Sequence, residues 1–215
     1  MARDTDDIGM YVGCTACVAL VTLNEIYVAN AGDSRCVLAR KNQAIEMSTD
    51  HKPELPTEKS RIEKAGGFVE ENRVKGILNL SRSLGDLEYK SDKSLAPELQ
   101  MITASPELKK EPINNQTDFV IIACDGIWDC LSSQEAVDFV YEQFNKHKSD
   151  KKYQISKCIE TMFDKIIAED VASSGNSLRP NFRRRHWVRQ HDVRCFSVQK
   201  IKNPLLLTAK FILFR

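Results

Sequence analysis

The chain has 215 residues, of which 42% are hydrophobic and 28% charged, and its formal net charge at pH 7 is +1. These values are typical of a soluble globular protein with one sizeable domain, or one domain and a tail. No stretch approaches the roughly 18 apolar residues of a membrane span, and residues 1–7 lack the apolar core of a signal peptide. Seven cysteines without framework spacing suit a reducing compartment. We therefore expect a cytoplasmic or nuclear protein without a membrane partner.

The first half of the chain is predicted to form an antiparallel meander of short strands. Residues 17–21, 26–29 and 35–39 are runs with strand propensity, and short turns separate them. Residues 44–47 follow as a further short run after another turn. Successive short strands with tight turns favour a sheet of hairpins over a β-α-β unit.

Three segments carry helix signals. Residues 57–65 have a helical pattern that ends at a pair of glycines. Residues 132–135 read Ser-Ser-Gln-Glu, a capping-box pattern that opens a helix through Phe144. Residues 153–168 place isoleucine and methionine on one helix face. Strands followed by late helices predict a layered domain of the α+β class.

The end of one predicted strand presents a carboxylate. Residues 119–123 are five consecutive apolar residues, which predict a buried strand. Asp125 and Gly126 follow almost at once, and Gly126 is expected to let the chain turn sharply. A carboxylate held at a strand end suits a hard cation such as Mg²⁺ or Mn²⁺. The alternative is an ordinary Asp-Gly turn after a core strand.

Three more polar turns accompany this strand end. One holds Asp33, the second holds His51, and the third places Arg82 and Asp86 around a glycine bend. Each turn alone would be interpreted as a surface turn, in which the polar groups cap or pair locally. The occurrence of all these turns in this order in one chain indicates a functional site much more specifically than any single turn does.

These turns belong to a longer series of motifs, which runs in unbroken order over roughly residues 10–173. The motifs are Gly-Cys-Thr-Ala at 13–16, Ala-Gly-Asp-Ser-Arg at 31–35, Asp-His-Lys-Pro at 50–53, Glu58 with Arg61-Ile62 and Ala-Gly-Gly at 65–67, Leu-Ser-Arg-Ser-Leu-Gly-Asp at 80–86, Ser-Pro-Glu at 105–107, and Ala-Cys-Asp-Gly-Ile-Trp-Asp at 123–129. In this series the chain resembles the metal-dependent (PPM-type, type 2C) protein serine/threonine phosphatase family.

The resemblance implies an α+β fold, a layered α-β-β-α sandwich of two antiparallel sheets flanked by helices. It also implies hydrolysis of phosphoserine and phosphothreonine in phosphoprotein substrates. In the family two Mg²⁺ or Mn²⁺ ions share a bridging water, whose lowered pKa yields a hydroxide that attacks phosphorus. A third, looser metal ion can bind beside them.

The resemblance also assigns site residues. The metal ligands would be Asp125, which matches a core ligand, and Asp33 and Asp129, which match carboxylates of the third metal site. The scaffold near the site would consist of Arg82, Asp86, His51 and Gly126. No catalytic residue beyond the metal ligands is matched.

The sequence also departs from the family pattern. Family members carry an Arg and a Glu in one strand and an Asp-Gly-His-Gly-Gly loop before the first motif, and a Gly-Cys-Asp-Asn-Met-Thr motif near the end. None of these occurs here, so among the core ligands only Asp125 is matched. We therefore expect a partial phosphatase domain over residues 1–173, an incomplete sandwich, and a chain that is inactive by itself. The alternative is a non-catalytic, phosphatase-like remnant that acts as a binding module.

The last segment has a different composition. From Gly175 to the end there are ten Lys or Arg residues and one acid, Asp192. Such a tail could indicate nucleic acid or an anionic membrane. However, codons that can encode residues 186–195, read one nucleotide later, also encode Ile-Gly-Cys-Asp-Asn-Met-Thr-Cys-Val, which contains the absent family motif. We therefore interpret residues 174–215 as a basic, frameshifted, aberrant tail with no nucleic-acid partner.

A genuine basic tail is the alternative to the frameshift. The apolar end at residues 211–214 has no evident partner surface in the sequence. We accordingly expect the tail to be disordered or badly packed.

Overall fold

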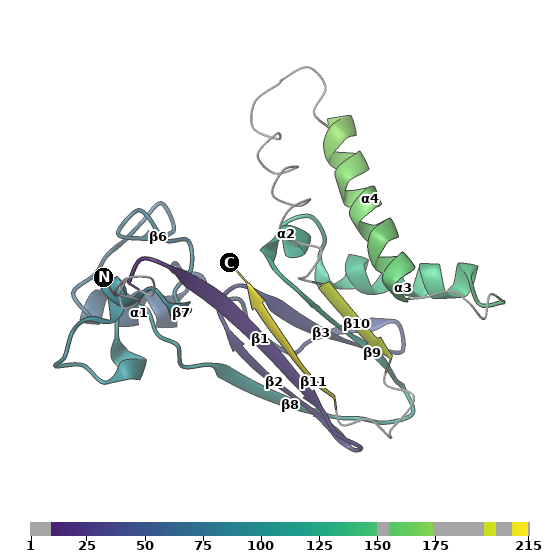
Figure 1. Cartoon of the computed structure of the whole chain (residues 1–215), viewed down its shortest axis with the longest axis horizontal. Coiled ribbons are helices and arrows are strands. Elements are labelled where there is room, and N and C mark those ends of the chain that lie inside the picture. The colour runs from purple at the N-terminus through teal and green to yellow at the C-terminus, as the bar shows by residue number, and fades with distance from the viewer. Residues whose placement is uncertain (1–9, 150–154, 174–195, 201–207, 215) are drawn as a thin grey trace, which may run out of the picture. The chain divides into compact units, whose positions relative to one another are not determined.

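The computed structural model describes residues 10–149, 155–173, 196–200 and 208–214, which divide between two units. The first unit is drawn from Met1–Arg35, Met47–Pro112 and Leu206–Arg215, and the second from Cys36–Glu46 and Ile113–Leu205. Figure 1 shows the elements of both units and labels most of them.

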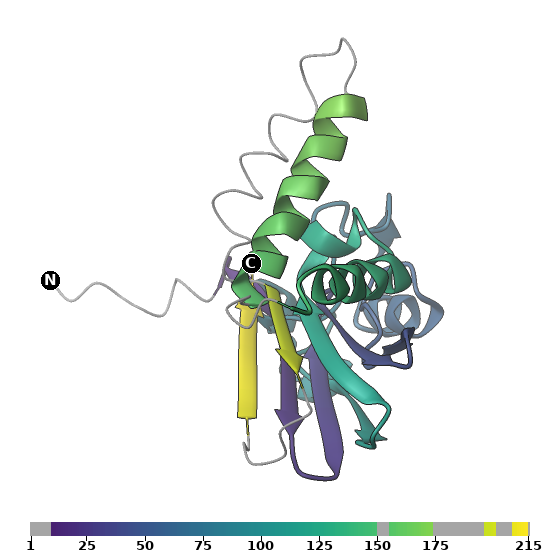
Figure 2. The same cartoon turned by 90° about the vertical axis from the view of Figure 1, so that its right-hand side faces the viewer.

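The first unit is built on an antiparallel sheet in the order β11-β1-β2-β8. Its strands are β1 (Gly13–Val21), β2 (Glu25–Ala31), β8 (Glu107–Pro112) and β11 (Thr208–Phe214), and β7 (Leu84–Gly85) pairs with the start of β1. The β1–β2 hairpin is the purple pair of strands in Figures 1 and 2. Burial alternates in the middle of β1, where Thr15, Cys17 and Ala19 are buried, as expected for a strand with one covered face.

The remainder of the first unit lies around a short helix. This part contains α1 (Pro56–Lys64), the two-residue strands β5 (Val69–Glu70) and β6 (Arg73–Val74), and the 3₁₀ turns η2 (Leu87–Lys90) and η3 (Pro97–Leu99). Ile62 of α1 is fully buried in a small core with Val74, Tyr89 and Ile102. The predicted helix at residues 57–65 is confirmed to within one residue at each end.

The second unit has a sheet in the order β10-β9-β3-β4, with helices after its longest strand. The strands are β3 (Arg35–Arg40), β4 (Gln43–Glu46), β9 (Thr117–Ala123) and β10 (Phe196–Lys200), and the helices are α2 (Asp125–Trp128), α3 (Ser133–Lys146) and α4 (Ile155–Ser173). Among the helices within the described ranges, none is both long and apolar enough to cross a bilayer.

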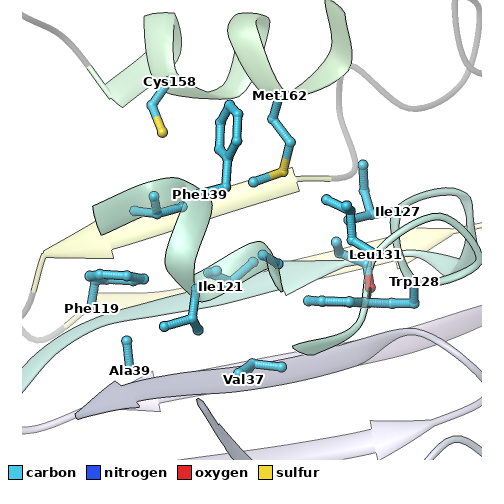
Figure 3. Packing of buried hydrophobic residues seen from close by; sticks show 14 of the residues in the cluster. Val37, Ala39, Phe119, Ile121, Ile127, Trp128, Leu131, Phe139, Cys158 and Met162 are labelled. Carbon is cyan, nitrogen blue, oxygen red and sulfur yellow. Dashed lines mark hydrogen bonds between the residues drawn. The ribbon is translucent and has the colours of Figure 1, made fainter. Parts of the chain in front are cut away.

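The main core of the second unit lies between its sheet and its helices. Phe119 and Ile121 of β9 pack in one cluster with Phe139 of α3 and Met162 of α4 (Figure 3). Five consecutive residues, Phe119–Ala123, are buried, which confirms the predicted buried strand. The predicted capping box of α3 is also present. Antiparallel sheets combined with helices confirm the α+β class.

The single meander predicted for the first half of the chain is wrong in one respect. β2 and β3 do not pair: β2 lies between β1 and β8, whereas β3 pairs with β4 in the other sheet. The chain leaves the first sheet at Gly32, whose φ of +123° favours glycine. Strand propensity identifies strands but does not say which strands will be neighbours.

The described part of the tail contradicts another expectation. The backbone of β11 pairs with β1, with Phe211 opposite Val18, and the backbone of β10 pairs with β9, with Phe196 opposite Ala123. The prediction that residues 211–214 lack a partner is therefore wrong for their backbone. Strand pairing uses main-chain groups, which any apolar run with strand propensity can supply to an open sheet edge. The rest of the tail lies outside the described residues.

The core of the second unit generates a stability prediction. Ile121→Ala is expected to lower the free energy of unfolding by about 2–5 kcal/mol, because it deletes buried methyl groups and leaves a cavity. Leu108→Ala, at a side chain that is 74% exposed, is the matched control and should change the free energy by less than about 0.5 kcal/mol. Urea unfolding followed by tryptophan fluorescence measures both values. Equal effects of the two substitutions would contradict the assigned core.

Candidate functional site

Asp125 and Asp129 are placed by a one-turn helix at the end of β9. The N–H of Asp129 donates to the carbonyl of Asp125 over 2.7 Å, which closes this turn. The indole Nε1–H of the buried Trp128 donates to the carbonyl of Ala123 over 2.8 Å and anchors the helix on the strand. Asp125 is half-buried and Asp129 is exposed. Because residues four apart lie on the same side of a helical turn, Asp125 and Asp129 share one side of α2.

Gly126 does not act as predicted. It lies inside α2 in helical backbone, so the chain changes direction through a helical turn and not through a conformation that only glycine favours. The strand-end position of Asp125 is confirmed all the same. A hydrophobic strand followed by Asp-Gly was enough to predict where the carboxylate is presented, although not by which turn.

Asp33 lies in a tightly packed turn of the first unit, between β2 and β3. It is only 4% exposed, and its Oδ2 accepts a hydrogen bond from Nζ of Lys52. A Cβ at Gly32 would lie 2.3 Å from the Thr15 side chain, so a larger residue would not fit there. The hydroxyls of Thr15 and Ser34 are hydrogen-bonded at 2.8 Å. These contacts hold the backbone on both sides of Asp33 against β1.

His51 supports the same turn. The backbone N–H of Gly32 donates to His51 Nδ1 over 3.2 Å, and the backbone N–H of His51 donates to the Gly32 carbonyl over 3.0 Å. Burial, with a smaller effect from the positive charge of Arg82, lowers the pKa of His51 below its usual range, although Glu58 and Glu107 oppose the shift. A neutral imidazole that accepts a hydrogen bond suits the scaffold role predicted for this residue.

Arg82 is bound to a carboxylate that the sequence did not single out as a site residue. Glu58, on α1, is 2% exposed. Its Oε1 accepts from Arg82 Nη2 over 2.6 Å, and its Oε2 accepts from Arg61 Nη1 over 2.7 Å and from the Ser81 hydroxyl over 2.6 Å. The spacing of Glu58 and Arg61 on one helix face was a signal of this pair. Nothing local in the sequence indicated Arg82 as the second cationic partner.

This network keeps Glu58 charged. Burial alone would raise the pKa of its carboxyl, but hydrogen bonds from Arg82, Ser81 and Arg61 outweigh burial and lower the pKa to about 2. Arg82 is in turn held at its other end, where Nη1 donates to the Ser105 carbonyl over 3.0 Å. The guanidinium of Arg82 therefore ties two loops to α1.

Asp86 packs against the start of β1. It has a left-handed backbone with φ of 50°, and its Oδ2 accepts from the Ser83 hydroxyl over 2.6 Å. A Cβ at Gly13 would lie 1.9 Å from Asp86 Oδ2, so the carboxylate rests directly on this glycine. This close approach explains why a glycine opens the Gly-Cys-Thr-Ala motif.

The predicted metal ligands belong to different units. Asp33 is in the first unit, while Asp125 and Asp129 come together in the second. Within the described ranges, no three His, Cys, Asp or Glu side chains are grouped so that they could hold one metal ion. The donors themselves are carboxylate oxygens, which are the ligands that Mg²⁺ and Mn²⁺ prefer.

Comparison with known proteins identifies the family. The family model described as Protein phosphatase 2C matches residues 2–175. The chain belongs to the protein phosphatase 2C family. It is 50% identical over 169 residues to probable protein phosphatase 2C 21 of Arabidopsis thaliana, which is 79% of this chain and 46% of that protein. It is 48% identical over 171 residues to probable protein phosphatase 2C 3 of Paramecium tetraurelia, which is 80% of this chain and 56% of that protein.

Solved structures show the same likeness. A phosphatase from Toxoplasma gondii has a TM-score of 0.61 at 27% identity, over 87% of this chain and 52% of that chain. Serine-threonine phosphatase 2C from Toxoplasma gondii has a TM-score of 0.65 at 21% identity, over 79% of this chain and 56% of that chain, and shows the fold alone. The chain spans about half the length of the protein phosphatase 2C relatives it matches.

The buried Glu58 predicts a pH-dependent stability. Because its folded pKa of about 2 lies below the usual 4.5, the stabilisation from Glu58 is present above about pH 4.5 and is lost as the pH falls towards 2. Glu58→Gln should therefore lower the free energy of unfolding at pH 7 and flatten its decline at acidic pH. Urea unfolding at a series of pH values measures this difference.

The control is Glu63→Gln, also on α1, where the carboxylate is 53% exposed and 3.9 Å from Lys59. This variant should follow the pH profile of the unchanged chain. If the pH profiles of Glu58→Gln and the unchanged chain were parallel, the ionised carboxylate of Glu58 would not stabilise the fold, which would contradict the prediction.

Proposed function

We propose that this chain is part of an Mg²⁺- or Mn²⁺-dependent enzyme that hydrolyses phosphoserine and phosphothreonine in phosphoproteins. Its membership of the protein phosphatase 2C family supports the reaction class. The observation that carries the proposal is the pair Asp125 and Asp129, joined by one helical turn at the end of a buried strand. Two adjacent carboxylates attract a divalent cation, which offsets their mutual repulsion. A cytoplasmic or nuclear site of action, without a nucleic-acid partner, is part of the proposal.

Three residues of the chain would hold such cations: Asp125, Asp129 and Asp33. A bound Mg²⁺ or Mn²⁺ supplies Lewis acidity, which polarises phosphoryl oxygens and lowers the pKa of water. Other predicted residues, which lie in the first unit, would support the position of Asp33 indirectly. His51 holds the turn that carries Asp33, and Asp86 rests on Gly13.

Arg82 is assigned to the scaffold and not to phosphate binding. Its Nε and Nη2 donate to Glu58, and its Nη1 donates to the Ser105 carbonyl. A guanidinium engaged in this way would have to break an ion pair with a buried carboxylate before it could bind a phosphoryl group, and breaking such a pair is costly.

We further propose that residues 1–215 alone have little or no phosphatase activity. Only Asp125 matches a core ligand, and one carboxylate does not hold a pair of divalent ions. The second candidate function is a binding module that retains phosphoproteins without turnover. It is favoured by the same shortage of matched ligands.

Mn²⁺ binding tests the metal site. Asp125→Asn should weaken Mn²⁺ binding to the 215-residue chain by at least about tenfold, since even changes outside the ligand shell of a metal commonly cost that much. Asp138→Asn, which alters an exposed carboxylate on α3, is the control and should leave the affinity unchanged. Calorimetric titration measures both. Equal Mn²⁺ affinities for the two variants would contradict the metal site.

Phosphate release separates the two candidate functions. A phosphothreonine peptide is incubated with the chain and Mn²⁺, and both binding and free phosphate are followed. Mn²⁺-dependent release that Asp125→Asn abolishes indicates an enzyme, and would refute our expectation that this chain is inactive. Binding without release indicates the binding module.

The frameshift within residues 174–215 also remains our proposal. A read of the transcript across this segment is expected to show a change of frame between about Ala172 and Arg179. Codons for residues 186–195 that cannot encode Gly-Cys-Asp-Asn-Met-Thr in the shifted frame would refute it.

A further inference from the structure

The ion pair between Asp33 and Lys52 joins two side chains of unequal freedom. Asp33 Oδ2 accepts a hydrogen bond from Lys52 Nζ. The Asp33 side chain is 6% exposed, whereas the Lys52 side chain is 30% exposed. A carboxylate buried this deeply needs a cation or hydrogen-bond donors, because an unpaired charge is costly to bury. Lys52 therefore neutralises the Asp33 carboxylate, whose buried position is set by the backbone of its turn.

The backbone under the pair is clamped on both sides. Immediately before Asp33, Gly32 exchanges hydrogen bonds with His51, the neighbour of Lys52. Two residues after Asp33, Arg35 binds Asp50 through two parallel hydrogen bonds of 2.9 and 2.8 Å. The turns that carry Asp33 and Lys52 are thus joined at two points, one on each side of the ion pair.

The two partners differ in how far they can move. Asp33 is short, and its neighbour Ser34 is buried and hydrogen-bonded to Thr15. Lys52 has a long flexible stem that can carry its ammonium into water while the backbone stays in place. A competing cation would therefore displace the lysine head and leave Asp33 where it is.

From this asymmetry we propose that Lys52 is a displaceable counter-ion of Asp33. Its ammonium occupies the carboxylate while no divalent cation is bound, withdraws when one binds, and so lowers the affinity of Asp33 for Mg²⁺ or Mn²⁺. The inference rests on the proposed function, because it takes Asp33 to be a cation ligand. It adds Lys52 as a residue that controls when a divalent cation binds to Asp33.

Competition follows from electrostatics. An ammonium and a divalent cation on the same carboxylate repel each other at short range, where water screens them poorly. A cation that binds Asp33 must therefore first break the ion pair, and its apparent affinity falls by the fraction of molecules in which the pair is open. For a partly exposed pair, a penalty of about fivefold is expected, which corresponds to about 1 kcal/mol.

The test compares Mn²⁺ binding to the unchanged 215-residue chain and to Lys52→Met, by electron paramagnetic resonance of free Mn²⁺. Lys52→Met should bind Mn²⁺ about fivefold more tightly. The gain should vanish when Asp33→Asn is introduced into both chains, since the carboxylate is then absent. Lys52→Arg, which keeps the charge, should bind like the unchanged chain.

Lys109→Met is the matched control for net charge. Its ammonium contacts Glu107 and the Thr49 hydroxyl, on the segment that leads to Lys52, and its side chain is 38% exposed. Removal of this charge should leave the Mn²⁺ affinity unchanged. A gain equal to that of Lys52→Met would overturn the inference, because a general loss of positive charge would then explain both.

Thermal unfolding in a chelator provides a readout that needs no metal. Lys52→Met should be less stable than the unchanged chain, because the Asp33 carboxylate stays buried without its cation. Asp33→Asn should remove this difference, and Mn²⁺ should raise the melting temperature of Lys52→Met more than that of the unchanged chain. Identical melting temperatures in chelator would overturn the inference.

The remaining outcomes separate the inference from the proposed function. Mn²⁺ binding that depends on Asp33 but is unaffected or weakened by Lys52→Met overturns the counter-ion role and leaves the proposed function standing. Absence of Asp33-dependent binding in both chains overturns Asp33 as a ligand, and the counter-ion role with it.

Discussion

The buried carboxylate of Glu58 is the charge around which the polar loops of the first unit are organised. Arg61 and Arg82 bring two guanidinium groups to it, and Ser81 adds a hydroxyl. Arg82 and Ser81 also serve other segments: Arg82 reaches the Ser105 carbonyl, and the backbone N–H of Ser81 donates to the His51 carbonyl. Because a buried charge must be fully paired, all these loops have to adopt their positions together. Ser81 is hydrogen-bonded to His51, and His51 is hydrogen-bonded to Gly32, so these contacts extend to the turn that carries Asp33.

The second unit positions its carboxylates by apolar packing instead. β9 is buried along its whole apolar run, and the helices that follow cover one of its faces. Trp128 closes the strand end with a hydrogen bond to Ala123, which leaves Asp125 and Asp129 at the rim of the core. One protein thus presents carboxylates in two ways, on a turn held by hydrogen bonds and on a helical turn held by hydrophobic contacts.

Local patterns predicted much of this arrangement. The buried strand before Asp125, the helix at residues 57–65 and the capping box of α3 were all predicted from runs of a few residues. All three are confirmed, the helix to within one residue at each end. The errors concern neighbours distant in sequence. β2 and β3 join different sheets, and β11 pairs with β1. Neither pairing could be predicted from the residues of these strands. Strand pairing depends on which sheet edges are open, a property of the assembled fold.

The sequence by itself determined the class of fold, the family and the order of the motifs, because these depend on hydrophobic periodicity and on residues at fixed short spacings. It also indicated Asp33 and Asp125 as carboxylates at turns, and the family resemblance added Asp129. Only the tertiary structure decided what these and the other polar residues touch. Glu58 as the partner of Arg82, and Lys52 as the partner of Asp33, arise from contacts across 24 and 19 positions of sequence. Such pairings are set when buried charges must find partners in a folded chain, and no local pattern records them.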